Sequence, residues 1–138
     1  MTATPATRSQ GLHVSLWVVQ GLLAAAFLMA GVIKTTQPLE ELAKNMAWTT
    51  AVPPLLVRFI GASEFLGALG LVLPSLTRIK PGLTPLAGAA LALVMLLAAI
   101  FHFPRGEYPA IGFNVVLGAL AAFVAWGRLK QAPIAPRG

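Results

Sequence analysis

The sequence predicts an all-α polytopic membrane protein, a bundle of four transmembrane helices with a short amphipathic helix on its outer side. The 138-residue chain is 57% hydrophobic but only 10% charged, whereas a soluble domain is about a quarter charged. Its apolar residues gather in four stretches, each close to the 20 or so residues that a spanning helix needs. A soluble fold of this size could not bury so much apolar surface.

The four predicted spans are residues 12–33, 54–73, 83–103 and 109–126. Pro54 and Pro109 suit the first turn of a helix, where the missing N–H costs little. Pro74, Pro81 and Pro104 are expected to mark the connecting loops. The first stretch is too long for the core of a signal peptide and lacks a clear cleavage site, so we expect it to be retained.

The connection between the first two spans is the longest one, and residues 38–48 (PLEELAKNMAW) have a helical pattern. Its apolar residues share one face at helical spacing: Leu39, Leu42, Ala43 and Met46. Thr36 suits the N-cap of this helix and Pro38 its first position. We therefore expect a short helix lying on the outer surface of the membrane.

The basic residues predict the orientation in the membrane, since an even number of spans puts both termini on one side. That side carries six basic residues and no acid: Arg8, Arg78, Lys80, Arg128, Lys130 and Arg137. The other side carries three basic residues and three acids: Lys34, Lys44, Arg105, Glu40, Glu41 and Glu107. By the positive-inside rule we expect both termini in the cytoplasm. Residues 1–11 and 128–138 would then be cytoplasmic tails on a transmembrane domain of residues 12–127.

The composition excludes several classes of function. Without a cysteine, the chain cannot run a thiol–disulfide relay, attach haem through CxxCH or hold a cysteinyl iron–sulfur cluster. His13 and His102 lie near opposite ends of the spans, so we expect no built-in metal site. The net charge of +6 comes from residues that flank the spans, which predicts a lipid bilayer rather than nucleic acid as the partner.

Glu64 is the most informative polar residue. It lies about 15 Å along the second span, near the midplane of the bilayer, where a charge facing lipid is costly. We expect it to face the interior of the bundle, beside Arg58 or Asn114. Arg58 precedes it by six residues and is turned about 120° away around the helix, so the two cannot form an i,i+4 pair.

Polar residues from all four spans fall in the outer half of the membrane. Lys34 ends the first span, Arg58 lies one turn inside the second, His102 ends the third, and Asn114 lies about 7 Å into the fourth. Together with Glu64 they predict a polar pocket that opens outward. Each has a plainer alternative: Lys34 can snorkel to headgroups, His102 can sit at the interface, Asn114 can join helices, and Arg58 can anchor a helix end.

Two motifs resemble the DoxX-like family of small four-helix membrane proteins: AGVIK at residues 30–34 and RFIGASEFLGALGLVLP at residues 58–74. The order of the other features is similar, with an outer loop helix, a polar residue ending the third span and an asparagine early in the fourth. The resemblance implies a four-helix bundle in the bacterial inner membrane. It also implies a site made of Lys34, Arg58, Glu64, His102 and Asn114.

The family takes its name from a subunit of a thiosulfate:quinone oxidoreductase, and other members are linked to redox or quinone stress. We therefore expect a lipophilic, polar-headed ligand such as a quinone, no built-in cofactor, and a redox protein or a second copy of the chain as partner. Lys34, Arg58 and Asn114 would bind the ligand, while Glu64 and His102 would handle protons.

Two other functions remain open. A membrane-embedded isomerase or hydrolase could use Glu64 as general acid or base with His102 as its partner. A transporter or assembly subunit is the third alternative, although four short helices without visible inverted repeats leave little room for alternating access.

Overall fold

The computed structural model describes residues 9–138, and within them the chain is helical, with no strand. The elements are α1 (Gln10–Thr36), α2 (Leu39–Asn45), the 3₁₀ turn η1 (Ala47–Thr50), α3 (Pro54–Thr77), α4 (Leu83–His102), α5 (Tyr108–Trp126) and the π-helical turn η2 (Gly127–Gln131). Four helices are long and apolar enough to cross a membrane, which confirms the predicted fold class. Most of the predicted N-terminal tail, including Arg8, lies outside the described residues.

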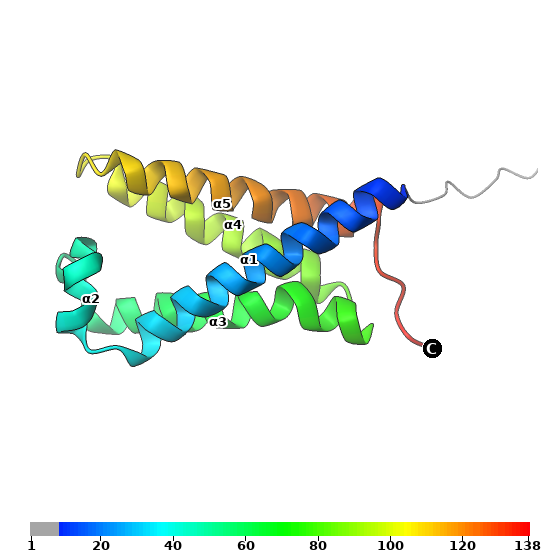
Figure 1. Cartoon of the computed structure of the whole chain (residues 1–138), viewed down its shortest axis with the longest axis horizontal. Helices are drawn as coiled ribbons and strands as arrows, with labels where there is room; N and C mark the ends of the chain where they lie inside the picture. The colour runs from blue at the N-terminus through cyan, green and yellow to red at the C-terminus, as the bar shows by residue number, and fades with distance from the viewer. Residues whose placement is uncertain (1–8) are drawn as a thin grey trace, which may run out of the picture.

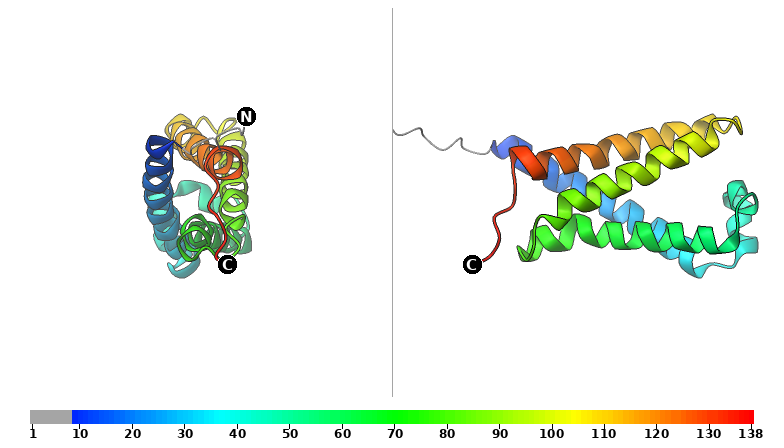
Figure 2. Two further views of the ribbon diagram at one scale, coloured as in Figure 1. Left: turned by 90° about the vertical axis from the view of Figure 1, so that its right-hand side faces the viewer. Right: turned by 180° about the vertical axis from the view of Figure 1, so that it is seen from behind.

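The helices form two pairs, α1 with α3 and α4 with α5 (Figure 1). Contacts of α3 with α4 and of α1 with α5 close the pairs into a four-helix bundle, as the end-on view in Figure 2 shows. All four contribute buried apolar side chains to one core: Leu23, Phe27, Ala68, Leu71, Leu91, Met95, Ala121 and Val124. One end of the bundle carries α2 and η1, hereafter the α2 end, and the other carries the C-terminus, hereafter the terminal end.

Glycines bring the helices of each pair into close contact. A Cβ atom on Gly31 would lie 2.6 Å from the backbone nitrogen of Phe65, and one on Gly61 would lie 2.7 Å from the Cβ of Lys34. The backbones of α1 and α3 therefore touch where any side chain would separate them. Lys34 and Glu64 each follow one of these glycines by three residues, about one turn, so the contact sets them side by side.

The prediction that Pro74 marks a loop is wrong. Pro74 is buried inside α3, which continues to Thr77. Proline removes one backbone hydrogen bond from a helix, but membrane helices tolerate it where neighbouring helices supply polar groups. Here the Gln20 side-chain amide from α1 donates to the carbonyl of Leu71 at 2.6 Å, one residue beyond the carbonyl that Pro74 leaves unpaired.

The outer helix is shorter than predicted. Thr36 does not cap it, because α1 runs on to this residue and the Thr36 hydroxyl donates to the carbonyl of Val32. Pro38 occupies the N-cap rather than the first helical position, and Trp48 falls in η1 after a break at Met46. The predicted apolar face is present, with Leu42 buried and Leu39 and Met46 half-buried.

Candidate functional site

An ion pair between α1 and α3 lies at the centre of the predicted site. Lys34 Nζ donates to Glu64 Oε1 at 2.6 Å. The Glu64 side chain is 2% exposed and that of Lys34 13%. Glu64 faces the interior because it shares the buried face of α3 with Val57 and Ala68.

Glu64 faces the interior of the bundle as predicted, and its predicted place beside Arg58 or Asn114 stays a prediction. The hydrogen-bond partner that the structure gives it is Lys34, which the sequence did not indicate, because α1 continues one turn past the predicted end and keeps Lys34 on the helix.

Arg58 caps the end of α1. Its Nη1 donates to the carbonyl of Lys34 at 2.9 Å and to that of Gln37 at 2.7 Å. The last carbonyls of a helix have no partner within the helix, and a cation is favourable there. Arg58 thus fixes the turn that carries Lys34, while its predicted contact with a ligand stays a prediction.

His102 is oriented by a carboxylate. It is the last residue of α4 and is 7% exposed, and its Nδ1 lies 3.1 Å from Glu107 Oε1. Glu107 also accepts a hydrogen bond from Arg105 Nε. The hydrogen bonds from Arg105 and His102 hold the pKa of Glu107 below its usual value. Because the carboxylate accepts, Nδ1 carries the proton, and Nε2 of the neutral ring is an acceptor.

Trp48 connects the two helix pairs at the α2 end. Lys34 Nζ lies 5.8 Å from its ring centre, within the range of a cation–π contact. The same ring meets His102 at 6.4 Å and Phe101 at 6.5 Å, both edge to face. A residue of η1 therefore links Lys34 on α1 to His102 on α4.

Asn114 enters the bundle from α5. It lies seven residues before Ala121 and ten before Val124, the other buried residues of α5, and it is 7% exposed. Its Nδ2 is buried without a hydrogen-bond partner. A buried donor left unpaired costs about 1–3 kcal/mol. In the described part of the chain, no hydrogen bond joins Asn114 to the other four predicted site residues.

Two hollows lie elsewhere on the described surface. The larger, of about 490 Å³, runs between α4 and α5 at the terminal end. The smaller, of about 210 Å³, lies between α1 and α3. Neither is lined by any of the five predicted site residues, so the predicted outward-opening polar pocket stays a prediction. Among residues 9–138, no three His, Cys, Asp or Glu side chains gather as a metal site would require.

Sequence reasoning missed Glu107 and Trp48. Glu107 follows His102 by five residues, across a turn in which Gly106 has φ +69°. Trp48 reaches His102 only through the tertiary fold. No spacing pattern in the sequence signals either contact.

A second polar cluster, hereafter the terminal-end network, was also missed. Gln20 donates to Leu71 O and lies 3.4 Å from Ser75 Oγ, whose hydroxyl is 2.7 Å from that of Thr84. Arg128 Nε donates to Gln20 Oε1 at 2.7 Å. The network therefore joins α1, α3, α4 and η2.

Arg128 is 3% exposed although it lies among the basic residues that flank the last span. Its Nη1 also contacts His13 Nδ1 at 3.0 Å and the carbonyl of Ala132 at 2.8 Å. The π-helical turn directs Arg128 inward, and nothing in the sequence marks that turn.

A model of the DoxX-like family matches residues 18–124, a stretch that contains all five predicted site residues. No match was found among curated proteins or among solved structures.

Proposed function

The chain belongs to the DoxX-like family and is an integral membrane protein with four spans, and on that premise we propose that it binds a lipophilic, polar-headed molecule such as a quinone inside the α2 end. The buried, unpartnered Nδ2 of Asn114 carries the proposal. A ligand carbonyl would satisfy this donor, and the removal of an unpaired buried group would favour binding.

The Lys34–Glu64 pair supports the same proposal. A buried ion pair is weak evidence for stability, because desolvation offsets the attraction between the charges. Ionisable groups inside membrane spans instead tend to mark functional sites. Lys34 would donate to a second ligand oxygen, Glu64 and His102 would exchange protons, and Arg58 would hold the end of α1. Electrons would come from a separate redox protein.

Tryptophan fluorescence tests the binding. The chain has Trp17, Trp48 and Trp126, and Trp48 is the one that contacts Lys34 and His102. A short-chain benzoquinone added to the protein in mild detergent should quench Trp48 saturably, and Trp48→Phe should remove that component.

Asn114→Leu should weaken the quenching affinity by about fivefold or more, the loss of one hydrogen bond of about 1 kcal/mol. Asn45→Leu makes the same change at the exposed end of α2 and should leave the affinity unaltered. If Asn114→Leu and the unmodified chain bound the benzoquinone with equal affinity, the proposal would be contradicted.

Acid–base catalysis on a hydrophobic substrate is the second candidate function. The contact of His102 with Glu107 favours it, because an imidazole held at Nδ1 by a carboxylate can take a proton at Nε2. Turnover of p-nitrophenyl esters without an electron acceptor tests for a hydrolase. The activity should fall in Glu64→Gln and His102→Gln, and equal rates in these variants would count against it.

We further propose that the chain lies in the bacterial inner membrane with both termini in the cytoplasm. The terminal end supports this, since it carries basic residues and no acid: Arg78, Lys80, Arg128, Lys130 and Arg137. Because the chain has no cysteine, single cysteines at Thr4 and Ala135 can be labelled cleanly. They should resist an impermeant maleimide in intact cells, and labelling of both would invert the orientation.

A further inference from the structure

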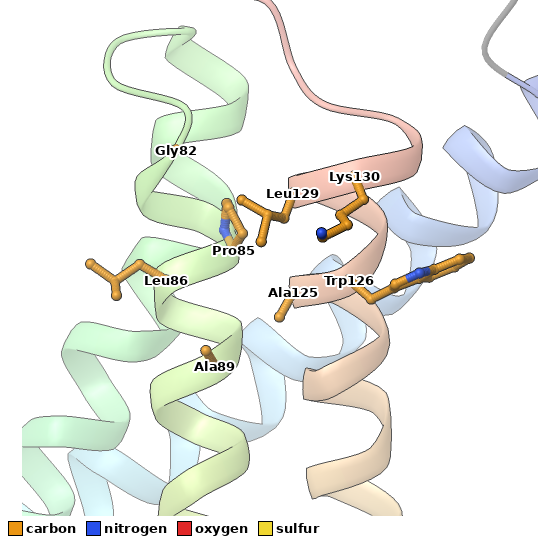
Figure 3. A pocket seen from close by; sticks show the side chains of 8 residues that line it. All are labelled: Gly82, Pro85, Leu86, Ala89, Ala125, Trp126, Leu129 and Lys130. Atoms are coloured by element: carbon orange, nitrogen blue, oxygen red, sulfur yellow. The ribbon is translucent and has the colours of Figure 1, made fainter. Parts of the chain in front are cut away.

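The larger hollow is an apolar groove at the terminal end, hereafter the α4–α5 groove (Figure 3). It is lined by Gly82, Pro85, Leu86, Ala89, Ala125, Trp126, Leu129 and Lys130. Its lining combines small residues with the exposed side chains of Leu86, Trp126 and Leu129. Large exposed apolar side chains on a transmembrane helix face lipid tails, so the groove opens into the bilayer and not into water.

The π-helical turn sets one cation at this groove. In η2 the amide of Ala132 donates to the carbonyl of Gly127, five residues back. Within this turn Arg128 is buried in the bundle, while Lys130 lies on the outside. Figure 3 shows the Lys130 amine pointing toward Leu129, over the groove. Lys130 therefore adds a positive charge to the otherwise apolar lining of the α4–α5 groove.

The charges around the groove have one sign. Lys80 lies in the turn that leads directly into Gly82, and Lys80 and Lys130 are both exposed. The four acids of the chain are Glu40, Glu41, Glu64 and Glu107, and none lies in residues 78–89 or 125–138, which form and flank the groove. Basic pockets between transmembrane helices suit anionic headgroups, and Trp126 is of the type enriched at the level of the headgroups.

We propose that the α4–α5 groove binds one anionic phospholipid, with an acyl chain along Pro85, Leu86 and Ala89 and the headgroup phosphate on Lys130. Two properties of the groove select this ligand. Its apolar lining suits a hydrocarbon chain, and its cation suits a phosphate diester with no compensating positive charge. A zwitterionic lipid would place its own cation beside Lys130 and Lys80.

Native mass spectrometry of the full chain from mild detergent tests the proposal, with phosphatidylglycerol and phosphatidylcholine of identical acyl chains as probes. The unmodified chain should retain more phosphatidylglycerol than phosphatidylcholine. Lys130→Gln should lower the retention of phosphatidylglycerol about fivefold, the effect of one cation near an anionic headgroup. Lys44→Gln removes the same charge at the α2 end and should have no effect.

A second pair of variants tests the apolar part of the α4–α5 groove. Ala89→Leu fills the groove from an exposed position and should lower the binding of both lipids. Ala90→Leu adds the same side chain to the neighbouring exposed position outside the groove and should be silent. Equal retention of the two lipids by the unmodified chain, or equal losses in Ala89→Leu and Ala90→Leu, would overturn the proposal. So would a dimer that disappears only in Ala89→Leu, because the occupant would then be a second copy of the chain.

Discussion

The two ends of the bundle hold their polar side chains in different ways. At the terminal end, Gln20, Ser75, Thr84 and Arg128 satisfy one another across the bundle by hydrogen bonds. At the α2 end, the buried ion pair joins only α1 and α3, Trp48 makes the link to α4, and the α5 donor Asn114 has no partner. A satisfied network specifies a structure, whereas a network with a spare donor has capacity for a ligand. We therefore expect the terminal end to contribute mainly stability and, under the proposed function, the α2 end to contribute binding.

The largest effect should come from breaking the ion pair from one side. Lys34→Met leaves the Glu64 carboxylate buried and unpaired and should lower the free energy of unfolding by about 3 kcal/mol. The double variant Lys34→Met/Glu64→Leu removes both charges and should recover most of that loss while abolishing quinone quenching. Unfolding in mild detergent with increasing sodium dodecyl sulfate measures the stability of both variants, and the tryptophan titration measures the quenching. A double variant as unstable as Lys34→Met would mean that the pair itself holds the α2 end together.

Sequence patterns predicted the spans well, because membrane helices are apolar over a length fixed by the bilayer. They also pointed to Lys34 and Glu64 as candidate site residues, since ionisable residues are conspicuous in an apolar stretch. The pairing of these two residues was missed because it depends on where α1 ends and on the contact between Gly31 and Gly61. A helix end predicted from sequence is uncertain by about one or two residues, and α1 runs on to Thr36, two residues before Pro38.

Arg128 shows a second limit of the sequence. A basic residue that follows an apolar span is normally interpreted as a topology signal. The side chain of Arg128 instead points into the bundle, because the backbone forms a π-helical turn at η2. Hydrophobic periodicity does not distinguish a π-helical turn from an α-helical one over five residues. The terminal-end network therefore could not be predicted from the sequence.

A smaller effect, of about 2 kcal/mol, should follow from Gln20→Leu, which removes the acceptor of Arg128 Nε and one of the two hydrogen-bond partners of Ser75 Oγ. The quinone affinity of the folded variant should stay unchanged, because Gln20 lies at the terminal end. Gln20→Glu keeps an acceptor for Arg128 and should lose less stability. Quenching titrations beside unfolding curves measure the two quantities, and a parallel loss of affinity and stability in Gln20→Leu would erase the difference between the ends.

The smallest effect should be at the turn after α4, where Glu107 accepts hydrogen bonds from Arg105 and His102. These bonds, that of Arg105 above all, lower the pKa of Glu107 below its ordinary value in the folded chain. A carboxyl whose pKa is lower when folded stabilises the fold above its unfolded pKa and loses that contribution as the pH falls through the folded pKa. Glu107→Gln should therefore lower the melting temperature slightly at pH 7 and have no effect at strongly acid pH.

High salt should shrink the difference at pH 7, because the pair of Glu107 with Arg105 is partly exposed and added ions screen such pairs. Arg105→Gln provides the matched control, since it removes one of the two hydrogen-bond donors to Glu107. In the Arg105→Gln background, Glu107→Gln should therefore lower the melting temperature by less than it does in the unmodified chain. The measurement is a series of thermal melts in detergent across pH for the single and double variants. If the gap between the unmodified chain and Glu107→Gln were the same at every pH, the carboxylate would be acting through packing and not through its charge, and the orientation of His102 by Glu107 would lose its electrostatic basis.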